Sequence, residues 1–204
     1  MMFSNLQYIQ HKRFIPLWRI AIFSFLGAFF MALMAQKKLP IPGTALQLSL
    51  QSLSVSLLVI IFQRKALWAV VVYLVLATLG FAVLADGSSD PNWFGSIKAG
   101  YYWGFLLASW VVGSVLATVR PHRFVKIWFC LSLNETLILF CGFLLLSYHF
   151  GFKQAWWIGV WPYILGALGK ITFAALFYKF ISLKRKRRRI AVASLNGINL
   201  NKIQ

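Results

Sequence analysis

Six long apolar runs occupy most of this sequence, and they restrict its fold more than any other feature. The runs at 20–36, 39–63, 66–85 and 99–119 contain no charged residue, while 127–152 contains Glu135 and 154–178 contains Lys170. A helix of about 18 or more apolar residues is long enough to cross the hydrocarbon core of a bilayer. With 60% hydrophobic residues, little of the chain remains for a soluble domain. The sequence therefore predicts an all-α membrane protein, a compact bundle of six transmembrane helices.

Basic residues are concentrated on one side of this six-span arrangement. Most of the 21 Lys and Arg residues precede the first run, join the second to the third or the fourth to the fifth, or follow the sixth. Cytoplasmic loops of membrane proteins carry such an excess of positive charge. We therefore expect a multi-pass protein of the plasma (inner) membrane with both termini in the cytoplasm and segment 86–98 outside.

This orientation divides the chain into three parts. They are a cytoplasmic N-terminus at 1–15, a six-span membrane domain at 16–183 and a basic cytoplasmic tail at 184–204. The first run begins like a secretory signal, but Met-Ala-Gln-Lys-Lys at 34–38 is a poor cleavage site and the run is long enough to span. It is therefore interpreted as the first membrane span.

The basic cluster KRKRRR at 184–189 suggests either anionic lipid or nucleic acid as a partner. Lys and Arg beside a membrane span are attracted to anionic headgroups. No nucleic-acid-binding fold accompanies the cluster. The expected partner of the tail is anionic lipid, and nucleic acid is not expected to bind.

The sequence lacks the patterns typical of an enzyme or a metal centre. Gly169 and Lys170 are not preceded and followed by the residues that a phosphate-binding loop requires. The three His residues are scattered. Cys130 and Cys141 would lie about 16 Å apart on one helix, too far for a disulfide. We expect no enzymatic activity, no cofactor and no metal.

Two charged side chains fall inside predicted spans. An acidic residue at mid-membrane costs about 2.5 to 3.5 kcal/mol on insertion scales, so Glu135 should face the interior of the bundle. A proton or ion relay is one possible role, but the favoured interpretation is a partner for a Lys or for backbone donors. Lys170 requires an anionic partner or a charged ligand, unless it extends towards the interface.

A short polar break separates the third and fourth runs. It holds Asp86 and Asp90, two of the three acidic residues of the chain, and Lys98. Such a break is typical of the mouth of a small-molecule site, or of a solvated turn with interfacial aromatic residues. The aromatic residues around it are Tyr73, Trp93, Tyr101, Tyr102 and Trp103.

Motifs in and beside this break resemble the BioY family, the biotin-specific S components of energy-coupling-factor (ECF) transporters. The family's third span typically reads YLLLGAxGLPVFA, its fourth opens with GPTxGYLxGF, and its sixth carries PFxxGDxxK. A PxPG turn precedes its second span. The resemblance extends over 16–181. Matching residues are Pro40, Pro42, Gly43, Tyr73, Leu74, Leu76, Gly80, Val83, Ala85, Ala99, Gly100, Tyr101, Gly104, Phe105, Pro162, Gly166 and Lys170.

The resemblance implies a substrate-capture subunit that binds biotin from outside. Its implied partners are a membrane-embedded T component and two ATPase subunits on separate chains. In the family, the Asp and Lys of the sixth-span motif face the vitamin, so Lys170 is expected to pair with the biotin carboxylate. Ala167 replaces the Asp, and Asp86 is the expected substitute acceptor for the ureido N–H groups. The other residues expected to bind substrate are Gln51, Lys98, Trp93, Tyr101 and Tyr73.

Ala28 and Ala32 form a pair of small residues four apart in the first span, which allows another helix to approach closely. S components carry an AxxxA pattern in this span that docks on the T component. The resemblance therefore implies that Ala28 and Ala32 contact that partner. Chance in an Ala-rich span is the alternative.

Two other functions stay open. Ala167, at the position of the family's Asp, suggests a transporter of another carboxylated vitamin or small molecule. A structural or assembly membrane protein without a small ligand would have the same apolar helices, and Lys170 and Asp86 would then be replaceable.

Overall fold

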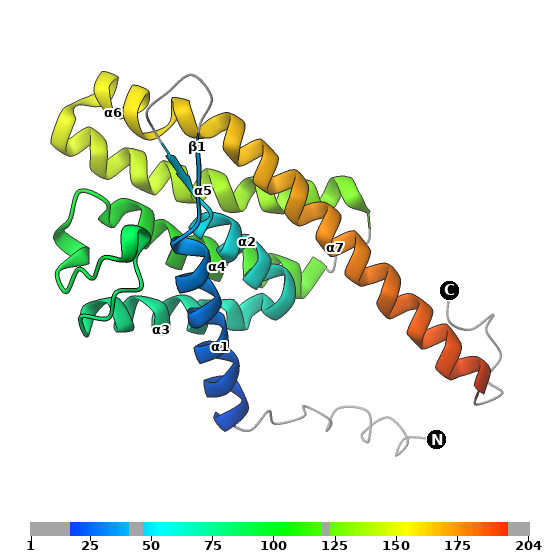
Figure 1. Cartoon of the computed structure of the whole chain (residues 1–204). Helices are drawn as coiled ribbons and strands as arrows, with labels where there is room; N and C mark the ends of the chain where they lie inside the picture. Colours follow the sequence, from blue (N-terminus) through cyan, green and yellow to red (C-terminus); the bar gives the residue numbers. More distant parts are fainter. Residues whose placement is uncertain (1–16, 41–46, 120–122, 196–204) are drawn as a thin grey trace, which may run out of the picture.

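The computed structural model describes residues 17–40, 47–119 and 123–195, and at positions 39, 40, 47, 48, 86 and 185–195 it describes the backbone alone. The expected N-terminal segment 1–15 and the Pro42-Gly43 turn lie outside the described residues. The elements in chain order are α1 (Leu17–Ala35), β1 (Lys38–Pro40), β2 (Gln47–Ser49), α2 (Gln51–Phe62), η2 (Gln63–Lys65), α3 (Ala66–Thr78), η3 (Ala85–Gly87), η4 (Trp93–Gly95), α4 (Ala99–Val119), α5 (Phe124–Phe150), α6 (Phe152–Gly159) and α7 (Trp161–Leu195) (Figure 1).

Within the described residues, five helical segments are long and apolar enough to cross a membrane. They are Leu17–Ala35, Gln51–Thr78, Ala99–Val119, Phe124–Phe150 and Phe152–Lys184. The predicted class, a helical membrane protein, agrees with this. The predicted count of six spans is not established, because α2 and α3 have only 12 and 13 residues and share the second segment.

Proline and glycine decide where the apolar runs are helical. The run at 39–63 is helical only from Gln51, because Pro40 fixes an extended backbone and β1 pairs with β2 in an antiparallel hairpin. The run at 66–85 leaves the helix after Thr78, and Gly80 adopts a φ of 86°. The last run breaks at Val160, and Pro162 lies in the first turn of α7, where its missing N–H breaks no helical bond.

The chain reverses direction between α2 and α3. The turn contains Gln63, whose φ is 52°. This turn packs directly against Gly113 of α4. A Cβ added to Gly113 would lie 2.6 Å from the Gln63 carbonyl oxygen. The Arg64 side chain donates to Thr118 Oγ1, near the end of α4. The α2–α3 turn and the C-terminal end of α4 therefore lie at the same end of the bundle.

The end of α1, the α3–α4 connection and α6 lie at the opposite end of the bundle. Gln36 Nε2, just after α1, donates to the Leu84 carbonyl over 2.8 Å. The Tyr101 hydroxyl in the first turn of α4 donates to the Gly159 carbonyl of α6 over 2.8 Å. The Leu50 N–H, before α2, donates to the Lys37 carbonyl, so the hairpin and the start of α2 lie here too.

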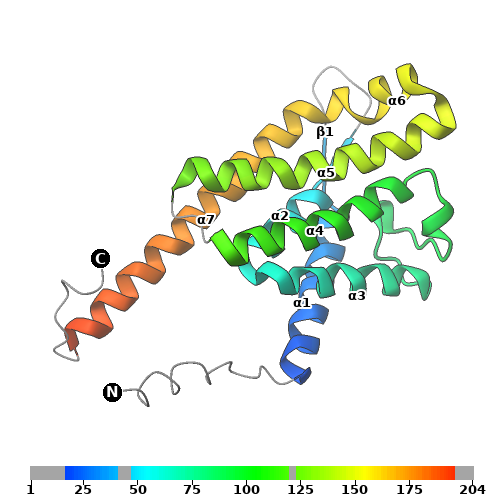
Figure 2. The ribbon, with the colours of Figure 1, turned by 180° about the vertical axis from the view of Figure 1, so that it is seen from behind.

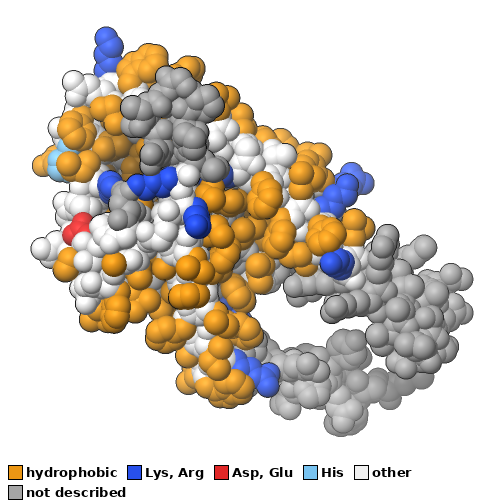
Figure 3. Space-filling model, in the orientation of Figure 1, with side chains coloured by type: hydrophobic (Ala, Val, Ile, Leu, Met, Phe, Trp, Pro, Cys, Tyr) orange, Lys and Arg blue, Asp and Glu red, His pale blue; other side chains and the backbone are white. Residues whose placement is uncertain are grey.

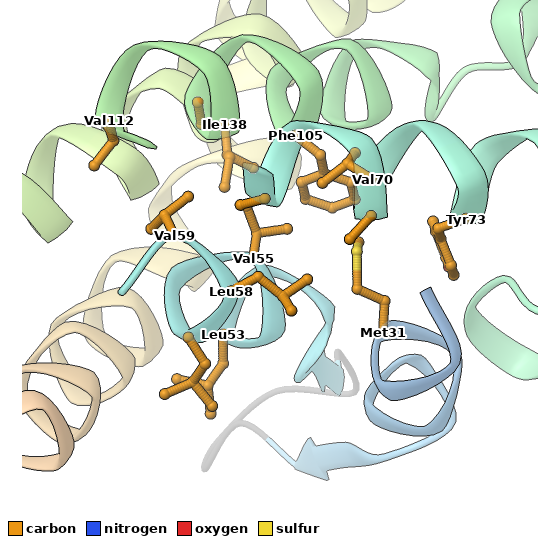
Figure 4. Close-up of a cluster of buried hydrophobic side chains, with 14 of the residues drawn as sticks. Met31, Leu53, Val55, Leu58, Val59, Val70, Tyr73, Phe105, Val112 and Ile138 are labelled. Carbon is orange, nitrogen blue, oxygen red and sulfur yellow. The ribbon is translucent and has the colours of Figure 1, made fainter. Parts of the chain in front are cut away.

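The short helix α2 lies at the centre of the core. All ten of its residues from Gln51 to Ile60 are buried. Side chains from α1, α3, α4 and α5 surround it, among them Met31, Val70, Phe105 and Ile138 (Figure 4). On the far side of the molecule α4 packs between α3 and α5 (Figure 2).

The outer surface is strongly apolar. Hydrophobic side chains cover much of the face seen in Figure 3, and Phe25, Phe29, Trp110 and Phe129 are all more than half exposed. Contiguous apolar surface on this scale marks a membrane or protein contact in a folded chain. It agrees with helices that face lipid on the outside and the α2-centred core on the inside.

The contact between α4 and α5 requires a glycine at position 104. An added Cβ there would lie 2.8 Å from Ile138 Cα and 3.0 Å from the Ile138 oxygen, both backbone atoms of α5. We expect Gly104→Ala to destabilise the protein by about 1–3 kcal/mol through overpacking. Gly169→Ala in α7 is the matched control, because nothing lies within 4 Å of its added Cβ. Thermal unfolding in detergent measures both, and equal midpoints would contradict the packing argument.

Candidate functional site

Lys170 lies beside the start of α2, in the interior of the bundle. Its Nζ donates to Ser52 Oγ over 2.9 Å, and the residue is partly buried. Among the described side chains it forms no direct ion pair. The nearest opposing charge is Glu135 on α5, which interacts with Lys170 electrostatically. The two charges that the sequence places inside spans thus belong to one local group.

A serine of α2 binds the Glu135 carboxylate. Ser56 Oγ donates to Glu135 Oε1 over 3.3 Å, and Ser52, which binds Lys170, lies one turn before Ser56 on α2. Glu135 is 3% exposed. Asn134 Nδ2 donates to Ser56 Oγ over 3.1 Å, while Asn134 Oδ1 is buried without a partner. These five residues form a polar network that joins α2, α5 and α7.

The serines of this network were not predicted as site residues. Ser52 and Ser56 lie four apart, so a helix places them on the same face one turn apart. That spacing is the only signal that the sequence offers, and it is weak because serine is common in membrane helices. In the structure this serine face contacts both charged residues: Ser52 accepts from Lys170, and Ser56 donates to Glu135.

Gln51 and Tyr73 form a second buried pair, next to the first network. Gln51 Nε2 donates to the Tyr73 hydroxyl over 2.7 Å, and that hydroxyl donates to the Val83 carbonyl over 3.0 Å. The pair ties α2 to α3 and to the α3–α4 connection. The structure therefore brings two predicted site residues together with each other and close in sequence to Ser52.

The α3–α4 connection borders an open cavity of about 250 Å³. Asp90 and Lys98 both line it, with Tyr102 as the aromatic wall. A cavity with one acid, one base and an aromatic face offers both donors and acceptors to a small polar molecule. The remaining lining residues are Leu84, Ser88, Ser96 and Ile97.

The two other aromatic residues predicted for the site have structural partners. The Trp93 indole N–H donates to Thr78 Oγ1 over 2.9 Å, and its ring packs edge-on against Tyr102. Trp93 therefore lies behind Tyr102, which lines the cavity. Tyr101 faces away from it, towards α5 and α6, where its hydroxyl donates to Gly159.

Asp86 was predicted to accept from the ureido N–H groups, and the structure does not describe its side chain. The backbone of Asp86 lies in η3, at the same end of the bundle as the start of α2, but its side chain lies outside the described set. Ala167 is buried on α7, one helical turn before Lys170. The methyl group of Ala167 offers no hydrogen bond there.

The pair Ala28 and Ala32 does not form a free surface. Ala28 is 0% exposed and belongs to the core, and Ala32 is partly buried against it. The neighbouring Gly27 packs against Ala69 of α3. The close approach that these small residues permit is thus made by α3 of the same chain. In this conformation only Ala32 retains surface for a partner.

The site's chemistry is ionic and hydrogen-bonding. Within the residues described, no group of three or more His, Cys, Asp or Glu side chains is arranged to hold a metal ion. A partly buried ammonium beside serine hydroxyls is suited to binding a carboxylate. The site and the apolar surface define a multi-pass helical membrane protein with a polar interior near one end.

Comparison with known proteins specifies this class further. A crystal structure at 2.1 Å of the S-component for biotin from an ECF-type ABC transporter has the same fold, with a TM-score of 0.70 over 88% of this chain and 94% of that chain at 16% identity. The probable biotin transporter BioY of Rickettsia prowazekii (strain Madrid E) is 26% identical over 158 residues, 76% of this chain and 81% of that protein. The family model named BioY matches residues 9–188. The chain belongs to the BioY family, which confirms the family predicted from its motifs.

The Tyr73 hydroxyl supplies a test of the second buried pair. Tyr73→Phe removes an acceptor from the buried Gln51 and a donor from the partly buried Val83 carbonyl. We expect a loss of about 1–3 kcal/mol in stability. The control is Tyr148→Phe, because Tyr148 is exposed. Thermal unfolding in detergent measures the difference, and an unchanged midpoint for Tyr73→Phe would show that water replaces the hydroxyl.

Proposed function

We propose that this chain is the biotin-binding S component of an ECF transporter, which binds biotin from outside and delivers it inward. The observation that carries the proposal is Lys170, an ammonium partly buried in a BioY-family bundle and directly bonded to a serine rather than to a carboxylate. The matched relatives are transport proteins, one described as a biotin transporter and one as an S-component for biotin. The chain is accordingly a transport subunit and not an enzyme.

The charge of Lys170 gives the ligand its orientation. A carboxylate that enters from the hairpin end would meet the ammonium with Ser52 beside it. Charge-assisted hydrogen bonds of this kind are roughly twice as strong as neutral ones. The biotin carboxylate is therefore proposed to bind at Lys170, and no cofactor is needed for this step.

The ureido ring needs an acceptor for its N–H groups. Asp86 is proposed for this role, because its backbone lies at the same end of the bundle as the start of α2. Lys98 lines the cavity at the α3–α4 connection, and Trp93 packs against Tyr102 of its wall. Gln51, which pairs with Tyr73, is next to Ser52 in the sequence of α2. Tyr101 is proposed to support the site through α6.

We propose six membrane crossings, with α2 and α3 counted separately. The reversal at η2 supports this, because it returns the chain to the end from which α2 began. At 1.5 Å per residue α2 is about 18 Å long, so the hairpin before it would complete the crossing. Both termini are then cytoplasmic, in the plasma (inner) membrane. The parts of the chain are 1–15, 16–183 and 184–204, with the basic tail on anionic lipid.

The proposed partners are a T component and two ATPase subunits on other chains. The fold match to an S-component of an ECF-type ABC transporter supports this assembly. Docking is proposed on α1, where Ala28 lies inside the core and Ala32 is partly accessible. The exposed residues beside Ala32 on this helix, Phe29 and Leu33, would complete the contact.

A second candidate is transport of a different carboxylated vitamin. It is favoured by Ala167, which leaves the face of α7 beside Lys170 without the acceptor of the family motif. A ligand with a carboxylate but without a ureido ring would still use Lys170. Binding of a vitamin panel to the purified protein separates the two candidates.

Lys170→Ala tests the carboxylate assignment. Removal of one partner of a buried charged pair costs about 2–5 kcal/mol, which is roughly 30- to several-thousand-fold in affinity. We expect Lys170→Ala to lose biotin binding by that factor in isothermal titration. Biotin amide should bind the unmodified protein weakly, and should bind Lys170→Ala about as well as biotin does. Lys153→Ala, at an exposed position of α6, is the control.

Two results would redirect this assignment. Normal biotin binding by folded Lys170→Ala would exclude Lys170 as the carboxylate partner and make Lys98 the next candidate. Asp86→Asn should weaken biotin and biotin amide alike, because both contain the ureido ring. If it leaves biotin binding unchanged, Asp86 is not the acceptor.

Cysteine labelling tests the orientation. Ser88→Cys and Arg64→Cys both lie at exposed positions, at opposite ends of the bundle. In a background with Cys130→Ser and Cys141→Ser, an impermeant maleimide added to intact cells should label position 88 and not position 64. Lysed cells should show labelling at both positions. The reverse pattern in intact cells would invert the topology.

A further inference from the structure

The interior network contains one base and one acid. Lys170 donates to Ser52, and Glu135 accepts from Ser56, one turn further along α2. With Lys170 as an ammonium and Glu135 as a carboxylate, the empty site is electrically neutral. A ligand carboxylate at Lys170 adds one negative charge to this neutral group.

That added charge has no second cation to balance it. Glu135 is 3% exposed, so water does not solvate it. Its hydrogen-bond partner Ser56 is neutral. Two carboxylates that share one site cannot both remain ionised without a large cost, and an unpaired charge in the interior costs several kcal/mol.

We propose that binding of a carboxylate ligand at Lys170 takes up one proton from solvent, which resides on Glu135 in the bound state. This inference rests on the proposed function for the position of the ligand, and it adds the proton stoichiometry of the binding step. The balance is one anion and one proton entering a neutral site, which leaves a neutral complex. No other reactant is required.

The surroundings of Glu135 supply no alternative charge. The helix α4 has no charged residue. Its tyrosines Tyr101 and Tyr102 are engaged with Gly159 and with the aromatic cluster at the cavity. The charged residue of α6, Lys153, is exposed in its first turn. Lys170 is the charged group that acts on Glu135 within the described part of the chain.

The sign of the pH dependence follows from the uptake. Because the complex holds one more proton than the free protein and the free ligand, a rise in pH favours dissociation. Affinity for biotin should fall about tenfold for each unit of pH within the window in which Glu135 is ionised in the free protein and protonated in the complex. Biotin amide brings no charge, so its affinity should not follow this trend.

Isothermal titration in buffers of different ionisation enthalpy counts the proton directly. The dependence of the binding heat on the buffer enthalpy should correspond to about one proton for biotin and about none for biotin amide. Glu135→Gln should bind biotin with no uptake, because Lys170 is partly exposed and stays charged alone. Lys153→Ala, at the exposed position of α6, should retain the uptake.

The outcomes separate this inference from the proposed function. Biotin binding by the unmodified protein without proton uptake would overturn the inference alone, as would one proton taken up by folded Glu135→Gln. Absence of biotin binding would overturn the proposed function and the inference with it. The comparison of biotin with biotin amide uses the unmodified protein, so it decides the question even if Glu135→Gln does not fold.

Discussion

The arrangement of the bundle depends on hydrogen bonds to the polar side chains of α2, because this helix is buried among its neighbours. Gln51, Ser52, Ser54 and Ser56 are all buried within a bundle whose outer surface is apolar. An unpaired polar group in such an environment costs roughly 1–3 kcal/mol in protein mutational data, and more where no water reaches it. Ser54 bonds to its own helix, and the other three bond to side chains of α3, α7 and α5. The polar positions of one short helix thus define which neighbouring helices meet there.

The same requirement explains how the bundle accommodates charge. Glu135 lies in the middle of α5, where an isolated carboxylate would be costly. It accepts a hydrogen bond from Ser56 and interacts electrostatically with Lys170, so the cost of burying either charge is reduced by the other. Lys170 remains partly exposed, whereas Glu135 does not. The pair is therefore asymmetric in exposure: Lys170 keeps some accessible surface, whereas Glu135 keeps almost none.

Sequence reasoning predicted the fold class and family, because apolar runs and ordered motifs are local features. It did not determine which side of each helix faces the core, because that depends on the rotation of the helix about its axis. Lipid-facing and core-facing sides of α1 are equally apolar, so the pattern does not show that Ala28 points inward. For the same reason it did not select Ser52 and Ser56, whose partners come from distant helices. The sequence did indicate that Glu135 and Lys170 need opposite charges as partners, because an unpaired charge inside a membrane span is costly.

The motifs that carry the family resemblance divide into packing and chemistry. Gly104, in the fourth-span motif, permits α4 to contact the backbone of α5, and Tyr101 fastens α4 to α6 through the Gly159 carbonyl. Both residues are accounted for without a ligand. Lys170, in the sixth-span motif, is not, because its only hydrogen bond within the described structure goes to a neutral serine hydroxyl. A match in the fourth span therefore supports the fold, whereas the substrate assignment depends on α7 and the start of α2.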